Sequence, residues 1–111
     1  MKAALIGVAI AFGALAGCQR AAAPAHHTAT YTVVMKDLAY GPAPSGLMPG
    51  DTIVWKNADI FRHTATARNG AFDVDLQPGQ SGATIVKTAG VIDVYCRYHP
   101  DMTMRLVVNS P

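Results

Sequence analysis

The feature that most constrains the fold is a series of short β-branched and aromatic runs separated by Gly and Pro. From about residue 30 to 109, no stretch shows a sustained helical period with capping residues. Roughly 80 residues of this kind are enough for one small hydrophobic core. The sequence therefore predicts an all-β domain, a small Greek-key β-sandwich or barrel. The runs expected to form strands are residues 31–35, 51–57, 63–67, 83–87, 91–95 and 105–108.

A thiol, an imidazole and a thioether lie within seven positions near the end of the chain, at Cys96, His99 and Met102. Zinc sites bind thiolates, imidazoles and carboxylates and have little use for a thioether. A thiolate, two imidazoles and a weak axial Met form instead the blue-copper electron-transfer site. The pattern therefore predicts a copper site and requires a second His upstream.

The N-terminal segment has the features of a secretory signal. Lys2 supplies a positive charge, and residues 3–14 are small or apolar, a run too short for a membrane-spanning helix of ~20 residues. The ending at residues 15–18, Leu-Ala-Gly-Cys, resembles the bacterial lipoprotein box, which implies that Cys18 becomes the lipidated first residue of the mature chain. The alternative is an ordinary signal cut near Ala16. We expect the protein in the bacterial cell envelope or periplasm, attached to a membrane by the lipid.

The segment after the signal reads as a flexible tether that reaches at most ~40 Å, because it has no apolar periodicity and no aromatic residue. His26 and His27 lie in this tether, where adjacent His residues are more often solvated than metal-bound. His63, in an expected strand, is therefore the better partner for the C-terminal donors. The predicted divisions are a signal peptide at 1–17, a tether at 18–29 and a folded domain at 30–111.

Charge gives little indication of a partner. The chain has nine Lys and Arg against seven acidic residues, and removing Lys2 with the signal leaves eight basic residues. Binding to nucleic acid needs a clustered basic surface. We therefore expect no nucleic-acid partner, and we expect a monomer.

The folded domain resembles the cupredoxin family along nearly its whole length. The resemblance rests on residues 49–57 with 63–66, on 72–73 with 76–81, and on 89–90, 93, 95–96 and 99–102. The loop length is closest to the amicyanin-like group, with two residues between Cys and His and two between His and Met. Plastocyanins and pseudoazurins have a longer spacing from His to Met.

The resemblance implies one type 1 copper ion bound by His63, Cys96, His99 and the axial Met102. Met104 is an alternative axial ligand, because it lies five residues after His99 as in the plastocyanin-like pattern. The ungapped match of the short loop favours Met102, which leaves Met104 as a packed residue at the start of a strand.

Two further polar residues lie close to the expected ligands. Thr64 follows His63, and its hydroxyl could bond to the Cys96 loop while its N–H reaches the thiolate; the alternative is a Thr chosen for strand propensity. Asn57 is expected to be a turn residue that caps its strand rather than a site residue.

The predicted function is electron transfer by a membrane-tethered protein with a single copper ion. A periplasmic protein that stores or delivers copper is the alternative. An enzyme is not expected, because the chain has no spare His or Cys outside the tether for a second centre. Redox partners are expected to dock near His99, on an apolar patch of Met48–Pro49, Phe61, Tyr98 and Pro100 with a rim of Arg62, Arg97 and Asp101.

Overall fold

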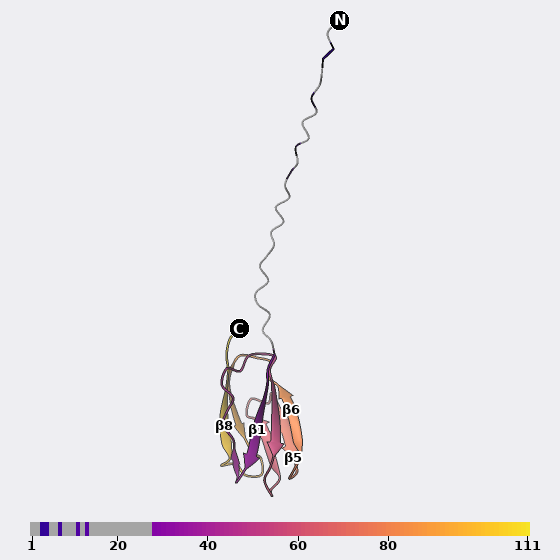
Figure 1. Cartoon of the computed structure of the whole chain (residues 1–111). Coiled ribbons are helices and arrows are strands. Elements are labelled where there is room, and N and C mark those ends of the chain that lie inside the picture. The colour runs from indigo at the N-terminus through magenta and orange to yellow at the C-terminus, as the bar shows by residue number, and fades with distance from the viewer. Residues whose placement is uncertain (1–2, 5–6, 8–10, 12, 14–27) are drawn as a thin grey trace.

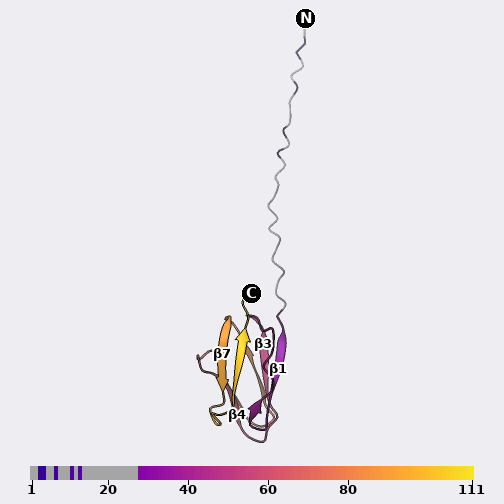
Figure 2. The same cartoon turned by 90° about the vertical axis from the view of Figure 1, so that its left-hand side faces the viewer.

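The computed structural model describes residues 3–4, 7, 11, 13 and 28–111. The described residues form two four-stranded sheets that pack face to face (Figures 1 and 2). This confirms the predicted all-β sandwich. The strands are β1 (Thr30–Lys36), β2 (Ala39–Tyr40), β3 (Thr52–Asn57), β4 (His63–Ala67), β5 (Asp73–Leu76), β6 (Ser81–Ile85), β7 (Gly90–Tyr95) and β8 (Thr103–Val108).

The strand order is β2-β1-β3-β6 in one sheet and β5-β4-β7-β8 in the other. Strands β1 and β3 run parallel, and all other neighbours are antiparallel. The chain changes sheet after β3, after β5 and after β6, so each sheet combines strands that are distant in sequence. This arrangement brings residues before β4 and after β7 to the same end of the sandwich.

Two strands were not predicted from the sequence. The turn before β2 has positive φ at Asp37 (53°) and Leu38 (57°), the backbone of a type I′ hairpin. Such a turn usually contains Asn-Gly or Asp-Gly, so Asp-Leu gave no hairpin signal. Strand β5 contains Asp73 and Asp75, and Asp is a poor strand former. Strand β6 also lies two residues earlier than predicted, and β8 begins two residues earlier but ends at Val108 as expected.

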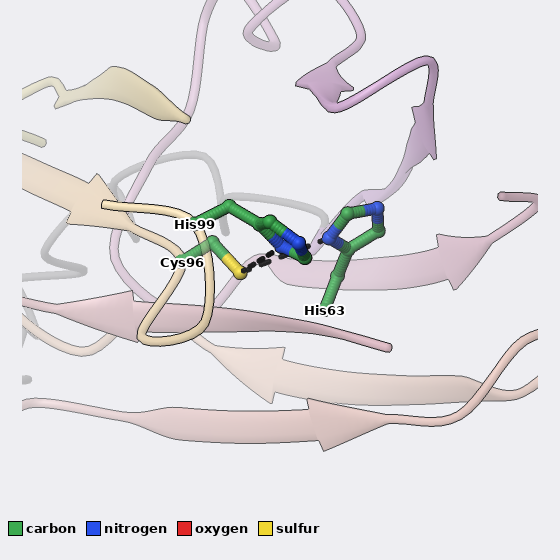
Figure 3. A group of neighbouring side chains, drawn as sticks. All are labelled: His63, Cys96 and His99. Carbon is green, nitrogen blue, oxygen red and sulfur yellow. Dashed lines mark hydrogen bonds between the residues drawn. The ribbon is translucent and has the colours of Figure 1, made fainter. Parts of the chain in front are cut away.

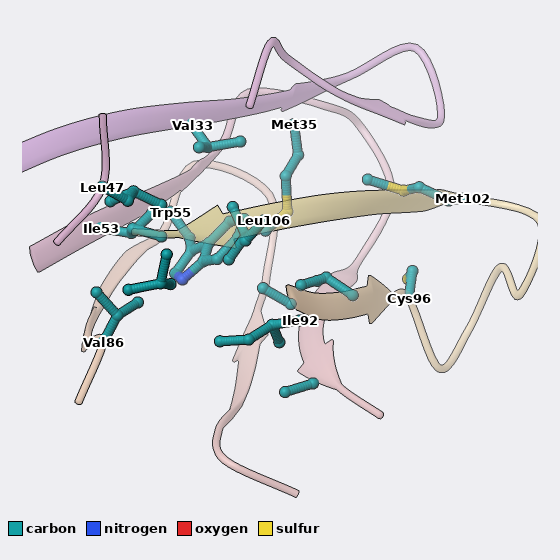
Figure 4. Close-up of a cluster of buried hydrophobic side chains, with 14 of the residues drawn as sticks. Val33, Met35, Leu47, Ile53, Trp55, Val86, Ile92, Cys96, Met102 and Leu106 are labelled. Carbon is teal, nitrogen blue, oxygen red and sulfur yellow. The ribbon is translucent and has the colours of Figure 1, made fainter. Parts of the chain in front are cut away.

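The core fills the space between the sheets, and Trp55 on β3 is its largest fully buried side chain. The indole packs against Tyr40 and Phe72, with ring centroids 6.0 and 5.9 Å away, and donates its N–H to Thr84. Figure 4 shows Cys96 and Met102 at one end of this cluster. The buried hydrophobic residues are Val33, Met35, Leu47, Ile53, Trp55, Ala65, Ala67, Leu76, Val86, Ile92, Val94, Cys96, Met102, Leu106 and Val108.

The sandwich has two distinct ends. At one end, β1 and β3 both begin, since Thr30 pairs with Thr52, and β8 finishes beside Leu47. At the other end, β3 finishes, β4 begins with His63, and β7 finishes just before Cys96. We call this second end the site end.

The expectations for residues 1–27 fall almost entirely outside the described residues. These include the lipidated Cys18 and the tether residues His26 and His27. Within the described part of the chain, no helix is long and apolar enough to cross a membrane.

Candidate metal centre

Three donor side chains meet at the site end. His63 opens β4, Cys96 follows the last residue of β7, and His99 lies in the loop between β7 and β8. Pairing of Thr66 with Tyr95 brings these elements together. One ligand atom from each of the three donors lies within 4.8 Å of the others, and Figure 3 shows both imidazole rings turned toward the sulfur.

The spacing of the donor atoms fits one central metal ion. The Sγ of Cys96 lies 3.7 Å from Nδ1 of His63 and 3.8 Å from Nδ1 of His99. Bonds of about 2.0 Å to nitrogen and about 2.3 Å to sulfur, 120° apart, would separate the two donor atoms by roughly 3.7 Å. Both sulfur–nitrogen separations therefore agree with a trigonal site, the arrangement that copper adopts with one thiolate and two imidazoles.

The His63 ring is held by a carboxylate that sequence analysis missed. Nε2 of His63 lies 2.8 Å from Oδ2 of Asp59, and the Asp59 side chain is only 7% exposed. A hydrogen bond from the Leu38 N–H, and then the one from His63, lower the pKa of Asp59 to about 2. The ionised carboxylate therefore accepts the proton of Nε2, which leaves the Nδ1 lone pair free for a metal.

The Cys96 sulfur is fully buried and accepts a backbone hydrogen bond. The N–H of Thr64 donates to Sγ at 3.3 Å, and the N–H of Arg97 donates to the Thr64 hydroxyl at 2.9 Å. The Tyr40 hydroxyl, on the opposite sheet, donates to the Thr64 carbonyl. Both contacts expected of Thr64 are present, while its role beside a bound metal stays a prediction.

The Tyr40 side chain is partly buried, which disfavours the ionised form of its phenol. Desolvation, and then the Coulomb interaction with nearby Cys96, raise the pKa of Tyr40 well above its usual range. The phenol therefore stays protonated at neutral pH and keeps donating to Thr64.

The loop register favours Met102 over Met104 as the axial ligand. The N–H of Cys96 donates to the Met102 carbonyl at 3.1 Å, so these two residues extend the β7–β8 ladder by one rung. Met104 pairs with Val94, two residues further from the donors, about 7 Å along the strand. Met102 is 4% exposed and lies at the site end of the core, and a turn bond from its N–H to the His99 carbonyl (2.9 Å) closes the loop.

Asn57 does more than cap its strand. Its side chain is fully buried, and its amide donates to the carbonyls of Phe61 (2.7 Å) and Leu76 (3.0 Å). Its carbonyl accepts the N–H of Asp59 at 2.9 Å, which forms an Asx turn. Asn57 therefore shapes the loop that delivers both Asp59 and His63.

Apolar side chains surround His99 at the surface. The Phe61 ring lies edge-on to the His99 ring at 5.8 Å, and neighbouring Ile60 is 81% exposed. A shallow hollow beside them is lined by Leu38 and residues 98–102. We call Leu38, Ile60, Phe61, Tyr98, His99 and Pro100 the His99 face.

One expectation about this face is wrong. Met48 and Pro49 do not border His99, because they precede β3 and lie at the opposite end of the sandwich. There the Met48 carbonyl accepts the N–H of Asp51 at 3.1 Å, just before Thr52 pairs with Thr30. Leu38 and Ile60 take their place, since the unpredicted β1–β2 hairpin lies at the site end.

Two members of the expected charged rim, Arg62 and Arg97, are paired with carboxylates. Arg62 donates two hydrogen bonds to Asp75, both at 2.8 Å, and Tyr98 donates to the same carboxylate at 2.7 Å. The Arg62 guanidinium also lies 4.9 Å from the Tyr98 ring centroid. The bonds from Arg62, with smaller contributions from Tyr98 and Arg97, hold the pKa of Asp75 below its usual range.

Fold and site together define a β-sandwich protein with a centre of one Cys and two His, of which Cys96 and His63 are buried. A family model described as a cupredoxin-like domain matches residues 7–108. The chain therefore belongs to the cupredoxin-like family. A comparison with curated proteins gives no significant match.

Solved structures of amicyanin variants share the fold. An oxidised methionine-to-leucine variant of amicyanin is 21% identical, with a TM-score of 0.65 over 71% of this chain and 81% of that one. The reduced Cu(I) form of a proline-to-glycine variant is 22% identical, with a TM-score of 0.65 over 72% of this chain and 82% of that one. A reduced tryptophan-to-tyrosine variant is 21% identical, with a TM-score of 0.65 over 72% of this chain and 82% of that one.

Proposed function

We propose that this chain is a type 1 copper electron-transfer protein, which carries one electron between redox partners. The observation that carries the proposal is the trigonal spacing of Cys96 Sγ and the two Nδ1 atoms of His63 and His99, 3.7 and 3.8 Å from the sulfur. Met102 is proposed as the axial ligand. When bound, copper would supply a one-electron couple between Cu(II) and Cu(I). The related amicyanin structures include a Cu(I) form, which agrees with this assignment.

The surrounding residues give each donor a fixed position. Asp59 orients the His63 ring, and the Thr64 N–H donates to the Cys96 sulfur. His63 and Cys96 are both 0% exposed, so water is kept from these two donors. A site held this firmly rearranges little when its charge changes, which favours rapid electron exchange.

A carrier fits the described residues better than an enzyme or a copper-delivery protein. Within residues 28–111, a single cluster of His, Cys and carboxylates has the spacing of a metal site. An enzyme would need a further centre or an open position for substrate. A delivery protein would need donors that release the metal readily, whereas His63 and Cys96 are enclosed by the fold.

The test is a Cu(II) titration of the purified protein, followed by optical absorption and electron paramagnetic resonance. We expect an intense blue band and narrow copper hyperfine splitting at one ion per chain. A pale product with an ordinary Cu(II) spectrum would contradict the carrier and favour storage or delivery of copper.

We further propose that a lipid on Cys18 anchors the protein to a membrane of the bacterial envelope. The folded domain supports a useful orientation, because β1 begins at one end of the sandwich (Figure 1), and His99, which follows β7, lies at the other. The His99 face would then point away from the membrane, toward soluble partners. Cys18→Ala should release the protein from the membrane fraction; a variant that stays membrane-bound contradicts the lipid anchor.

A further inference from the structure

A closed ring of hydrogen bonds connects a surface carboxylate with the Cys96 sulfur ligand. The Thr66 hydroxyl donates to Oδ1 of Asp73 at 2.7 Å, and the hydroxyls of Thr64 and Thr66 lie 2.8 Å apart. The backbone N–H of Arg97 donates to the Thr64 hydroxyl at 2.9 Å. The side-chain Nε of Arg97 donates to Oδ1 of Asp73 at 3.1 Å, which closes the ring. We call these four residues the Asp73 ring.

The chemistry of the groups fixes the direction of every bond in the ring. An ionised carboxylate only accepts, so the single hydroxyl hydrogen of Thr66 points to Asp73. The Thr66 oxygen then accepts from the Thr64 hydroxyl, and the Thr64 oxygen accepts from the Arg97 N–H. Bonds aligned in one direction polarise and strengthen one another. Thr64 and Thr66 are buried, so their hydroxyls depend on protein partners for their hydrogen bonds.

The ring reaches the candidate metal centre at two places. Thr64, a member of the ring, donates its backbone N–H to Sγ of Cys96 at 3.3 Å. Arg97, another member, directly follows Cys96 and begins the loop that carries His99. A displacement of Thr64 or of the Arg97 backbone would therefore move either the donor to the sulfur or the start of the loop.

We propose that Asp73 and Thr66 are positioning residues for the Cys96 site. Neither side chain hydrogen-bonds to a predicted ligand, and both act through Thr64 and Arg97. The carboxylate of Asp73 holds the Thr66 hydroxyl at the surface end of the ring. The Thr66 hydroxyl in turn holds that of Thr64, which lies in the buried space between β4 and the Cys96 loop. The positioning itself is independent of the proposed electron-transfer function; its effect on reduction potential rests on that function.

The chain supplies a matched control in Asp93. Asp93 pairs with Arg105 at 3.1 Å, the distance at which Asp73 pairs with Arg97. The two Asp side chains are also similarly exposed, at 53% and 51%. Asp93 differs because its partner is on β8, away from the Thr64–Thr66 pair, so removing Asp93 deletes an ion pair and leaves the ring intact.

The first test uses metal-free protein purified from cells that express the full chain. Amide hydrogen exchange is followed by NMR for the N–H groups of Thr64 and Arg97. We expect Thr66→Val and Asp73→Ala to accelerate both exchange rates at least tenfold, while Thr66→Ser, which keeps the hydroxyl, and Asp93→Ala leave them unchanged. Unchanged protection in Thr66→Val and Asp73→Ala would overturn the proposal, as would an equal loss in Asp93→Ala.

The second test measures the reduction potential of the copper-loaded protein. Thr66→Val changes no charge, so a shift reports the hydrogen bond to sulfur rather than a removed carboxylate. We expect a lower potential, because a weaker N–H donor stabilises the more negative reduced site less. A tenfold fall in the Cu(I) to Cu(II) ratio at fixed potential corresponds to 59 mV.

The two tests separate the failure of this proposal from the failure of the proposed function. A potential that stays at the wild-type value in Thr66→Val, despite faster exchange, would overturn the positioning role at the site. If wild-type protein bound no blue copper, the proposed function would fail, and the exchange rates in metal-free protein would still decide whether Asp73 and Thr66 hold Thr64 and Arg97.

Discussion

The backbone N–H of Thr64 donates to Sγ of Cys96 at 3.3 Å, across 32 residues of sequence. This bond joins the start of β4 to the loop after β7. Tyr40 from the opposite sheet donates to the carbonyl of the same Thr64. Strands from both sheets therefore hold the sulfur's hydrogen-bond donor.

Removal of Asp59 should weaken copper binding. Asp59→Ala deletes the acceptor that fixes the tautomer and orientation of His63. Loss of such a partner typically lowers metal affinity about 10- to 100-fold, and we expect that range in a competition titration with a copper chelator. Asp93→Ala, which removes a carboxylate remote from the donors, is the control. Equal affinities for Asp59→Ala and wild type would show that the bond to His63 has no influence on the metal.

The two Met residues of the C-terminal loop should respond differently to substitution. Met102→Leu removes the proposed axial thioether and should change both the optical spectrum and the reduction potential. Met104→Leu, at the position paired with Val94, should leave both unchanged. Each swap conserves volume, so stability should fall by less than about 1.5 kcal/mol. The opposite result would assign the axial position to Met104.

Asn57 should be important for stability as well as for the site. Asn57→Ala removes the side-chain donor to the carbonyls of Phe61 and Leu76, of which the bond to Leu76 is buried. It also leaves the N–H of Asp59 without its acceptor. We expect the free energy of unfolding to fall by about 2–4 kcal/mol, measured by urea denaturation of metal-free protein. Asn69→Ala breaks a comparable bond to the Ala71 N–H in an exposed turn and should cost less than about 1 kcal/mol. Similar losses of unfolding free energy in the two variants would mean that the bonds of Asn57 stabilise the fold no more than an exposed turn bond does.

The His99 face is our proposed docking surface for redox partners. Ile60 is 81% exposed beside Phe61, whose ring contacts His99. Electron self-exchange between oxidised and reduced copies of the protein provides a defined probe. Ile60→Lys should slow self-exchange at least tenfold and increase its dependence on salt, because it places a like charge at the contact. Val91→Lys, at an exposed position at the other end of the sandwich, is the control; an equal effect there would remove the case for this face.

The sequence predicted the donors better than it predicted what holds them. Cys96, His99 and Met102 form a compact local pattern with distinctive chemistry. His63 begins a short run with β-branched Thr residues, which predicts a strand from local sequence alone. Their convergence then follows from the pairing of β4 with β7. Asp59 carried no such signal, because a carboxylate in a short loop is common and only the fold brings it to the His63 ring.

The surface around the site was harder to predict, for a topological reason. The expected placement of Met48–Pro49 beside His99 failed because it depends on the direction of β3 relative to the site. That direction is set by the parallel pairing of β1 with β3, a long-range contact that local patterns do not encode. Leu38 reaches the site through a hairpin with an unusual Asp-Leu turn. The Asp73 ring could not be predicted either, because it depends on the register of β4 and β5, which pairs Thr66 with Asp73.

The proposed copper site depends on the thiolate of Cys96, which we expect to bind one copper ion together with two distant imidazoles. Its most direct test compares wild type with Cys96→Ser after loading with Cu(II), recording the absorption spectrum and the dissociation constant for copper. We predict that the intense blue band disappears in Cys96→Ser and that copper binds far more weakly. If the variant keeps both the colour and the affinity of the wild type, Cys96 is not the sulfur ligand and the account is contradicted.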